Sequence, residues 1–223
     1  MTEKDIQRDT FLGGEGDGYF TRNQSALSRL DAARSFVVQR IAHHMPATRE
    51  ARVLEIGCAT GANLVALGAV RQIAGVGIDP SPQAIAAGRH DSPALSLQVG
   101  TADALSFEDA SFDVVWFGFC MYLVDRGLLH RVIAEADRVL REDGLLAIHD
   151  FDPDVPTRRP YHHRPGLNSY KMDYSRLFLA DPAYALLEKA SFTHHALQWS
   201  ADPQERVGLW ILRKNVQLAY RST

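Results

Sequence analysis

The sequence predicts an α/β protein with a doubly wound, mostly parallel sheet. Three observations support this fold class. The run Arg52–Ile56 is short, apolar and rich in branched residues, as in a buried strand. A glycine-bearing turn follows it, and a helical pattern begins at Asn63, which completes a strand–turn–helix unit. Similar units follow along the chain, and 223 residues with 46% hydrophobic side chains are enough for one domain with a sizeable core.

The other elements are predicted from apolar spacing and from helix and turn signals. We expect a helix over 23–45, and a helix over 83–89 that Ser81 caps and Pro82 begins. Strands are expected at 73–78, 95–100, 112–118 and 144–148, and helices at 125–141 and 180–189. Residues 192–199 and 207–214 predict two closing strands.

Charge and cysteine content narrow the class of protein. The net charge is −3 and no basic run occurs, so a nucleic-acid partner is not expected. Cys58 and Cys120 are far apart in sequence, which favours a reducing compartment without disulfides. No apolar leader or membrane-spanning run is present, so we expect a cytoplasmic protein without a membrane partner. A homodimer is left open.

The glycine turn indicates which ligand this sheet binds. A dinucleotide loop has three glycines in the spacing G-x-G-x-x-G. Here there are two, Gly57 and Gly61, with three residues between them. Glu55 stands at the end of the strand, where a carboxylate repels a pyrophosphate and attracts an ammonium group. The turn therefore suits the amino-acid end of S-adenosylmethionine (SAM) as cofactor.

At these residues the chain resembles the class I SAM-dependent methyltransferases, whose first motif is E/D-x-G-x-x-x-G. Further resemblances are Asp103-Ala104, the strand entry 111–115, and the segment 138–144, where Asp143 replaces a glycine of the family. They cover roughly residues 31–214 and are specific for SAM, not for its acceptor. The resemblance implies a seven-stranded sheet that ends in an antiparallel hairpin.

The other cofactor contacts follow from position and from the resemblance. Asp79 ends the second strand roughly twenty residues after the glycine turn, the spacing of a carboxylate that binds ribose hydroxyls. Pro80 and Ser81 follow it. The resemblance implies that Asp103 accepts a hydrogen bond from the adenine amino group beside the Ala104 amide. Phe119, after the fourth strand, is a further cofactor candidate.

Residues 1–30 are expected to form an N-terminal arm or lid, before a binding domain at 31–223. Flexible glycines precede Tyr19 and Arg22, which suits a lid over a ligand. The stretch is similar to a G-D-x-Y-x-x-R-N segment of bacterial methyltransferases of surface-sugar biosynthesis, which implies that Tyr19 and Arg22 cover the SAM site. An ordinary arm that packs through its aromatic side chains is the alternative.

The substrate loop is expected at about 150–176, at the edge of the sheet that holds the glycine turn. His149, His162 and His163 are candidates for the general base. A metal site from Asp150, Asp152, His162 and His163 lacks compact spacing, so no metal is expected, and a solvated loop without chemistry is the other alternative. Cys120 is expected to be part of the wall rather than a nucleophile. The candidate substrate contacts are Tyr122, Asp150, Tyr161, Arg164 and Tyr170.

Together these features predict a SAM-dependent methyltransferase that acts on a small polar acceptor. A sugar or nucleotide-sugar oxygen or nitrogen is the acceptor we expect, because the substrate loop is rich in His, Tyr and Arg. Two alternatives are kept: an NAD-dependent oxidoreductase, and a non-catalytic subunit that binds SAM.

Overall fold

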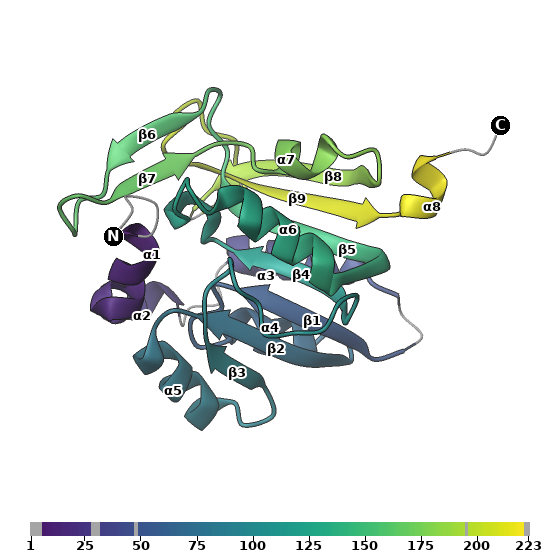
Figure 1. Ribbon diagram of the computed structural model, residues 1–223, viewed down its shortest axis with the longest axis horizontal. Coiled ribbons are helices and arrows are strands. Elements are labelled where there is room, and N and C mark those ends of the chain that lie inside the picture. The colour runs from purple at the N-terminus through teal and green to yellow at the C-terminus, as the bar shows by residue number, and fades with distance from the viewer. Residues whose placement is uncertain (1–5, 28–31, 47–48, 195, 221–223) are drawn as a thin grey trace.

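The computed structural model describes residues 6–27, 32–46, 49–194 and 196–220. Its main layer is a seven-stranded sheet in the order β3-β2-β1-β4-β5-β9-β8. Five strands are parallel, and β9 and β8 run antiparallel as a closing hairpin (Figure 1). This confirms the predicted fold class. The strands are β1 (Ala51–Ile56), β2 (Ile73–Asp79), β3 (Ser96–Val99), β4 (Phe112–Gly118), β5 (Leu140–Phe151), β8 (Tyr184–Thr193) and β9 (Arg206–Lys214).

Two apolar layers cover the sheet. Side chains of α3 (Ala32–His44), α4 (Ala62–Gly68) and α5 (Pro82–Asp91) pack on one face, with Val53 and Trp116 of the sheet. Side chains of α6 (Leu129–Val139) and α7 (Ser175–Leu179) pack on the other face, with Leu54 and Phe117. The central strands are buried on both faces, which accounts for their continuous apolar runs.

The crossover helices follow their sequence signals. α5 begins as predicted, because the Ser81 hydroxyl accepts a hydrogen bond from the Ala84 amide at 3.0 Å and Pro82 stands in the first turn. α6 lies inside the predicted 125–141. The predicted helix over 23–45 is two helices, α2 (Gly16–Leu27) and α3, and the expected domain boundary at 30–31 lies outside the described residues.

Three predictions about local structure were wrong. Residues 180–189 are not a helix, because β8 begins at Tyr184 and pairs with β9. The strand expected at 192–199 ends at Thr193. The substrate loop contains an antiparallel hairpin, β6 (Thr157–Pro160) with β7 (Asn168–Lys171), as a second small sheet.

The N-terminal arm is helical. It consists of α1 (Ile6–Thr10), the π-helical turn η1 (Phe11–Glu15) and α2, with a break at Gly14, whose φ is 123°. The short 3-10 helix η2 (Met121–Leu123) follows β4, and α8 (Val216–Ala219) follows β9. Among the described residues, no helix combines the length and apolar character that crossing a bilayer requires.

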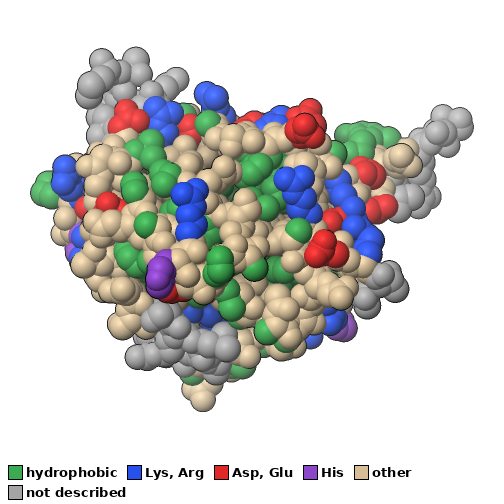
Figure 2. Space-filling view, turned by 90° about the horizontal axis from the view of Figure 1, so that it is seen from below, with side chains coloured by type: hydrophobic (Ala, Val, Ile, Leu, Met, Phe, Trp, Pro, Cys, Tyr) green, Lys and Arg blue, Asp and Glu red, His purple; other side chains and the backbone are tan. Residues whose placement is uncertain are grey.

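Charged side chains are distributed over the surface. On the face that Figure 2 shows, the described Lys and Arg side chains are scattered among apolar and neutral ones rather than gathered in one patch. The absence of a nucleic-acid partner stays a prediction.

Candidate active site

A cavity of about 520 Å³ opens at the carboxyl ends of the parallel strands. Its floor comes from the residues that follow β1, β2 and β4, and its cover from the N-terminal arm. This is where ligands bind in doubly wound sheets, and the volume lies within the ~300–1,000 Å³ of small-molecule sites. The cavity contains ten of the residues that the sequence predicted for the site: Tyr19, Gly57, Asp79, Pro80, Asp103, Phe119, Tyr122, His149, Tyr161 and His163.

The glycine turn after β1 needs its glycines for two reasons. Gly57 and Gly61 have φ of 78° and 79°, in the left-handed region. A Cβ on Gly57 would lie 2.6 Å from Cβ of Cys120, so a side chain does not fit there. Gly57 lines the cavity, whereas Gly61 stands at the N-terminus of α4 and does not.

Glu55, near the end of β1, is fully buried and does not itself line the cavity. Its Oε1 accepts a hydrogen bond from Nδ2 of Asn63 at 2.6 Å, and its Oε2 has no partner among the described residues. Burial raises the pKa of this carboxyl to about 8. A buried carboxylate oxygen without a partner fits a cationic group, and the ammonium of SAM supplies one.

Asp79 extends from the tip of β2 into the cavity. Each of its oxygens accepts one backbone hydrogen bond of 2.9 Å, from the amides of Ala59 and Ser81. Each oxygen can accept a further hydrogen bond, and the two hydroxyls of a ribose could donate them. Burial raises the pKa of this carboxyl to about 6, so it is mostly ionised at pH 7. Ser81 does not line the cavity; it caps α5.

Asp103 lies between β3 and β4 and is the residue expected to contact the adenine. The side chain is buried and lines the cavity, and Nη1 of Arg8 in α1 donates a hydrogen bond to it at 3.1 Å. Ala104 does not line the cavity, and its amide donates to the Thr101 carbonyl at 3.3 Å. Sequence reasoning missed Arg8, because no motif marks it.

The N-terminal arm is fastened over the cavity at several points. Asp17 of α2 accepts hydrogen bonds from the Ser81 hydroxyl at 2.6 Å and the Gln83 amide at 3.0 Å. The Tyr19 and Tyr122 hydroxyls lie 3.3 Å apart. Arg22 does not line the cavity; it donates to Glu15 and to the Tyr161 hydroxyl, and so joins the arm to the segment between β6 and β7.

Phe119, just after β4, stands at the centre of an aromatic cluster that lines part of the cavity. Its φ is 65°, a left-handed conformation that is strained for a non-glycine residue, and its amide donates to the His149 carbonyl at 3.0 Å. Its ring contacts Tyr122, His149, Phe151 and His194 edge-on, at centroid distances of 5.5, 5.0, 4.9 and 5.1 Å.

The histidines predicted from the sequence occupy different positions. His149 and His163 line the cavity, whereas His162 is exposed and outside it. His194, immediately after β8, also lines the cavity. No local sequence signal marks His194, because it lies in a segment without a motif, directly after the strand that pairs with β9.

Three predicted substrate contacts lie outside the cavity. Asp150 is buried, and its oxygens accept hydrogen bonds from the amides of Tyr122 at 3.2 Å and Phe151 at 2.7 Å. Arg164 is exposed. The Tyr170 ring packs under the guanidinium of Arg126, 4.6 Å from it.

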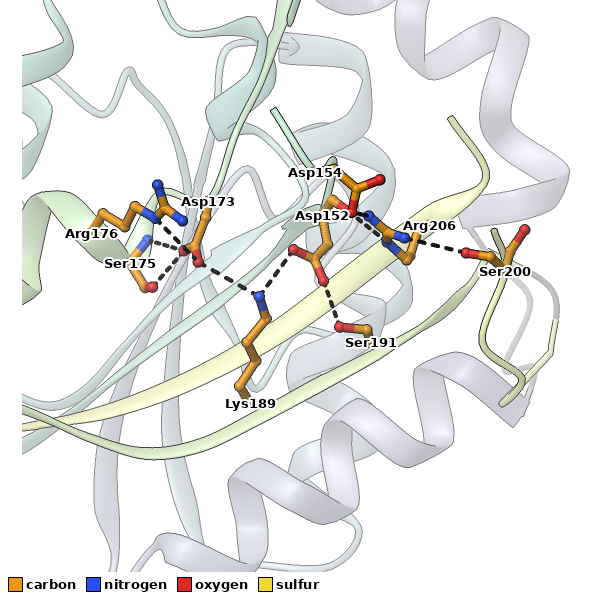
Figure 3. Close-up of polar contacts among 9 residues, drawn as sticks. All are labelled: Asp152, Asp154, Asp173, Ser175, Arg176, Lys189, Ser191, Ser200 and Arg206. Carbon is orange, nitrogen blue, oxygen red and sulfur yellow. Dashed lines mark hydrogen bonds and ion pairs between the residues drawn. The ribbon is translucent and has the colours of Figure 1, made fainter. Parts of the chain in front are cut away.

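Asp152, directly after β5, lies outside the cavity and takes part in a different cluster (Figure 3). It accepts from Nζ of Lys189 at 3.1 Å and from the Ser191 hydroxyl, and its carbonyl accepts from Nε of Arg206 at 2.8 Å. The described residues contain no group of three or more His, Cys, Asp or Glu side chains that could hold a metal ion.

Comparisons with known proteins agree with this geometry. Residues 53–144 match a family described as a methyltransferase domain. A 27-O-demethylrifamycin SV methyltransferase of Amycolatopsis mediterranei is 33% identical over 131 residues, which are 55% of this chain and 46% of that protein. This chain therefore matches less than half the length of that relative.

Residues 53–144 are a methyltransferase domain of the SAM-dependent class I family. SAM is the cofactor of this family, and the unpartnered Glu55 oxygen and the Gly57 turn fit it.

Solved structures show that the methyltransferase fold extends beyond that domain. A Burkholderia thailandensis 1,6-didemethyltoxoflavin-N1-methyltransferase, with its substrate and S-adenosylhomocysteine bound, has a TM-score of 0.66 at 16% identity and covers 94% of this chain and 87% of its own. The [4+2]-cyclase SpnF has a TM-score of 0.67 at 15% identity and covers 96% and 97%. At these identities the likeness concerns the fold alone.

Proposed function

We propose that the protein transfers the methyl group of SAM to a small organic acceptor. The observation that carries this proposal is the buried Glu55 carboxylate, with one oxygen unpartnered, just before a turn that has no room for a side chain at Gly57. When bound, SAM supplies a sulfonium methyl whose carbon bonds to an acceptor lone pair as its bond to sulfur breaks, which leaves S-adenosylhomocysteine (SAH) and an acceptor proton to be removed.

The chain contributes binding, orientation and proton removal. Glu55 and the Gly57 turn hold the methionine part, Asp79 holds the ribose, and Asp103 holds the adenine. The N-terminal arm excludes water from the cavity and positions the acceptor, which is much of the catalysis when the methyl donor is already activated.

We assign the removal of the acceptor proton to an imidazole. Burial raises the pKa of both Tyr19 and Tyr122, so both hydroxyls stay protonated and neither is a base near pH 7. His149 lies on β5, lines the cavity and contacts the Phe119 ring, whereas His162 and His163 are exposed. Among the predicted bases it therefore has the best position.

The fold alone also permits a reaction other than methyl transfer, because SpnF is described as a [4+2]-cyclase. A non-catalytic SAM-binding subunit and an NAD-dependent oxidoreductase are the alternatives from the sequence. The two-glycine turn opposes the last of these, since a dinucleotide-binding loop has three glycines in the spacing G-x-G-x-x-G.

Thermal unfolding with SAH and with NAD separates these functions. We expect SAH to raise the midpoint in proportion to the logarithm of its concentration, and NAD to have no effect. The isosteric Glu55→Gln variant should respond less to SAH, while Glu50→Gln, on the exposed chain before β1, should respond like wild type. Stabilisation by NAD alone would reject the proposal. SAH binding without methylated product across sugars, phenols and amines would favour the non-catalytic subunit or the cyclase-like role.

A further inference from the structure

One end of the cavity is formed by segments that carry no SAM motif. They are the end of β5, the turn between β6 and β7, and the connection between β8 and β9. We call this part of the cavity the acceptor end. Its lining residues are His149, Phe151, Tyr161, His163, His194 and Val207.

The acceptor end has a restricted chemistry. None of these six described lining residues carries a carboxylate, an amide, an ammonium or a guanidinium group. Recognition of a sugar depends on several such groups placed around its hydroxyls, and recognition of a diphosphate depends on Arg or Lys. These six residues offer fewer such groups than the sugar or nucleotide-sugar acceptor that the loop composition predicted would need, while Arg8, Asn23 and Arg34 line other parts of the cavity.

Aromatic rings provide most of the wall instead. The Phe119 and Phe151 rings are 4.9 Å apart and inclined by 62°. His194 contacts both of them, at 5.1 and 5.2 Å. An aromatic ring has a negative face and a positive edge, so aromatic rings prefer edge-to-face or offset-stacked contacts. A planar aromatic ligand can make contacts of the same kind with these rings.

The Phe151 ring is held rigidly. The amide of Phe151 donates to the Asp150 carboxylate, and the next residue, Asp152, is bound by Lys189 and Ser191 (Figure 3). The Lys171 ammonium lies 3.4 Å from the centroid of the Phe151 ring. A wall that is already ordered costs little conformational entropy when a ligand binds.

The polar atoms of the acceptor end are three imidazoles and one phenol. An imidazole can donate or accept one hydrogen bond at neutral pH and can take up a proton. The Tyr161 hydroxyl already accepts from Arg22 at 3.1 Å. This set matches a guest with one or two hydroxyl or ring N–H groups on an otherwise apolar plane.

We propose that the methyl acceptor is a planar hydroxylated aromatic or heteroaromatic compound, bound against Phe119 and Phe151 with its polar group toward His149 and His194. This inference depends on the proposed function, because it assigns the occupant of the space beside the cofactor. In the transfer, the hydroxyl oxygen of the acceptor forms the new bond to the methyl carbon, the bond from sulfur to that carbon breaks with its electron pair left on sulfur, and the hydroxyl proton passes to an imidazole.

Equilibrium binding to the SAH-saturated protein tests the proposal without relying on turnover. The probes are 2-naphthol and 8-hydroxyquinoline, with methyl glucoside and UDP-glucose as the competing class, measured by calorimetry. We expect the aromatic probes to bind and the sugars not to. Phe151→Leu keeps the apolar volume but removes the ring, so it should weaken the aromatic probes by about two- to twelve-fold.

Controls make each outcome decisive. Phe107→Leu, outside the cavity and packed on Phe112, should bind all probes like wild type. His194→Leu is the second variant and should weaken the probes by about two- to twelve-fold through a lost hydrogen bond, even if Phe151→Leu does not fold. Binding of the sugars alone, binding of no probe, or equal affinity in the folded cavity variants and wild type would overturn the proposal. A protein that does not bind SAH would instead remove the proposed function.

Discussion

Arg8 of the N-terminal arm donates a hydrogen bond of 3.1 Å to the carboxylate of Asp103, the residue that the family resemblance assigns to adenine. The pair joins the first helix of the arm to the segment between β3 and β4, about a hundred residues further along the chain. Asp17 provides a second attachment through Ser81 and Gln83. The arm is therefore tied to the elements to which the proposed function assigns the ribose and the adenine, not only packed through its aromatic side chains.

Arg8→Ala should weaken the attachment of the N-terminal arm over the cavity. The Arg8 side chain is 27% exposed and Asp103 5%, so the pair is partly screened and worth about 1 kcal/mol. We expect SAH to dissociate about five-fold faster in stopped-flow measurements, and the unfolding midpoint of the ligand-free protein to fall by about 2–4 °C, as a loss of about 1 kcal/mol implies for a chain of this length. Arg131→Ala, on the exposed side of α6, is the matched control. Equal dissociation rates in the two variants would show that the arm does not retain the ligand.

Glu55 should couple SAH binding to proton release. Its pKa of about 8 in the ligand-free protein means that it is largely protonated at pH 7. An ammonium beside it lowers that pKa, so binding releases up to about 0.9 proton at pH 7, and SAH affinity rises with pH toward 8. Calorimetry in buffers of different ionisation enthalpy measures this number. Glu55→Gln should abolish most of the release, since Asp79 is already ionised at pH 7. Release of the same size in that variant would assign the proton to another group.

Gly57→Ala should destabilise the protein even without a ligand. The left-handed φ of 78° costs an alanine about 1–2 kcal/mol, and the 2.6 Å approach to Cys120 adds an overlap of similar size. We expect the unfolding free energy to fall by about 2–4 kcal/mol in urea. Gly68→Ala in α4 should be neutral or stabilising, since an added Cβ there meets only atoms at 3.8 Å and beyond. A variant at Gly57 as stable as wild type would mean that the turn relaxes.

The parts of the site that sequence reasoning located are those fixed by a short stretch of chain. Glu55, Gly57 and Asp79 are placed by a strand end and the turn that follows it, so their spacing along the chain already sets their geometry. Arg8 and His194 reach the cavity through tertiary packing alone. Nothing in their local sequence distinguishes them from other surface residues.

β8 shows how tertiary pairing overrides local preference. In the segment Tyr184–Thr193, Tyr184 is followed by Ala, Leu, Leu, Glu and Lys, which favour a helix in isolation. It is a strand because β9 offers a partner that is buried from Arg206 to Leu212, and because Glu188 meets Arg40 at 2.7 Å and His44 at 2.8 Å on α3. The register of the β8–β9 pairing shifts between Leu186 and Glu188, within this helix-favouring stretch.

His149→Gln tests the assignment of the base. Removing a general base lowers kcat by about 10²–10⁴-fold, while SAH affinity should stay within about two-fold, because the imidazole lies beyond the cofactor contacts. The acceptor is whichever aromatic probe binds, and the product is followed by mass spectrometry. The rising limb of the pH–rate profile should disappear in this variant and persist in His162→Gln, whose side chain is exposed and outside the cavity. If both variants keep wild-type rates and profiles, the proton leaves by another route, and the same comparison at His163 and His194 decides between the remaining imidazoles.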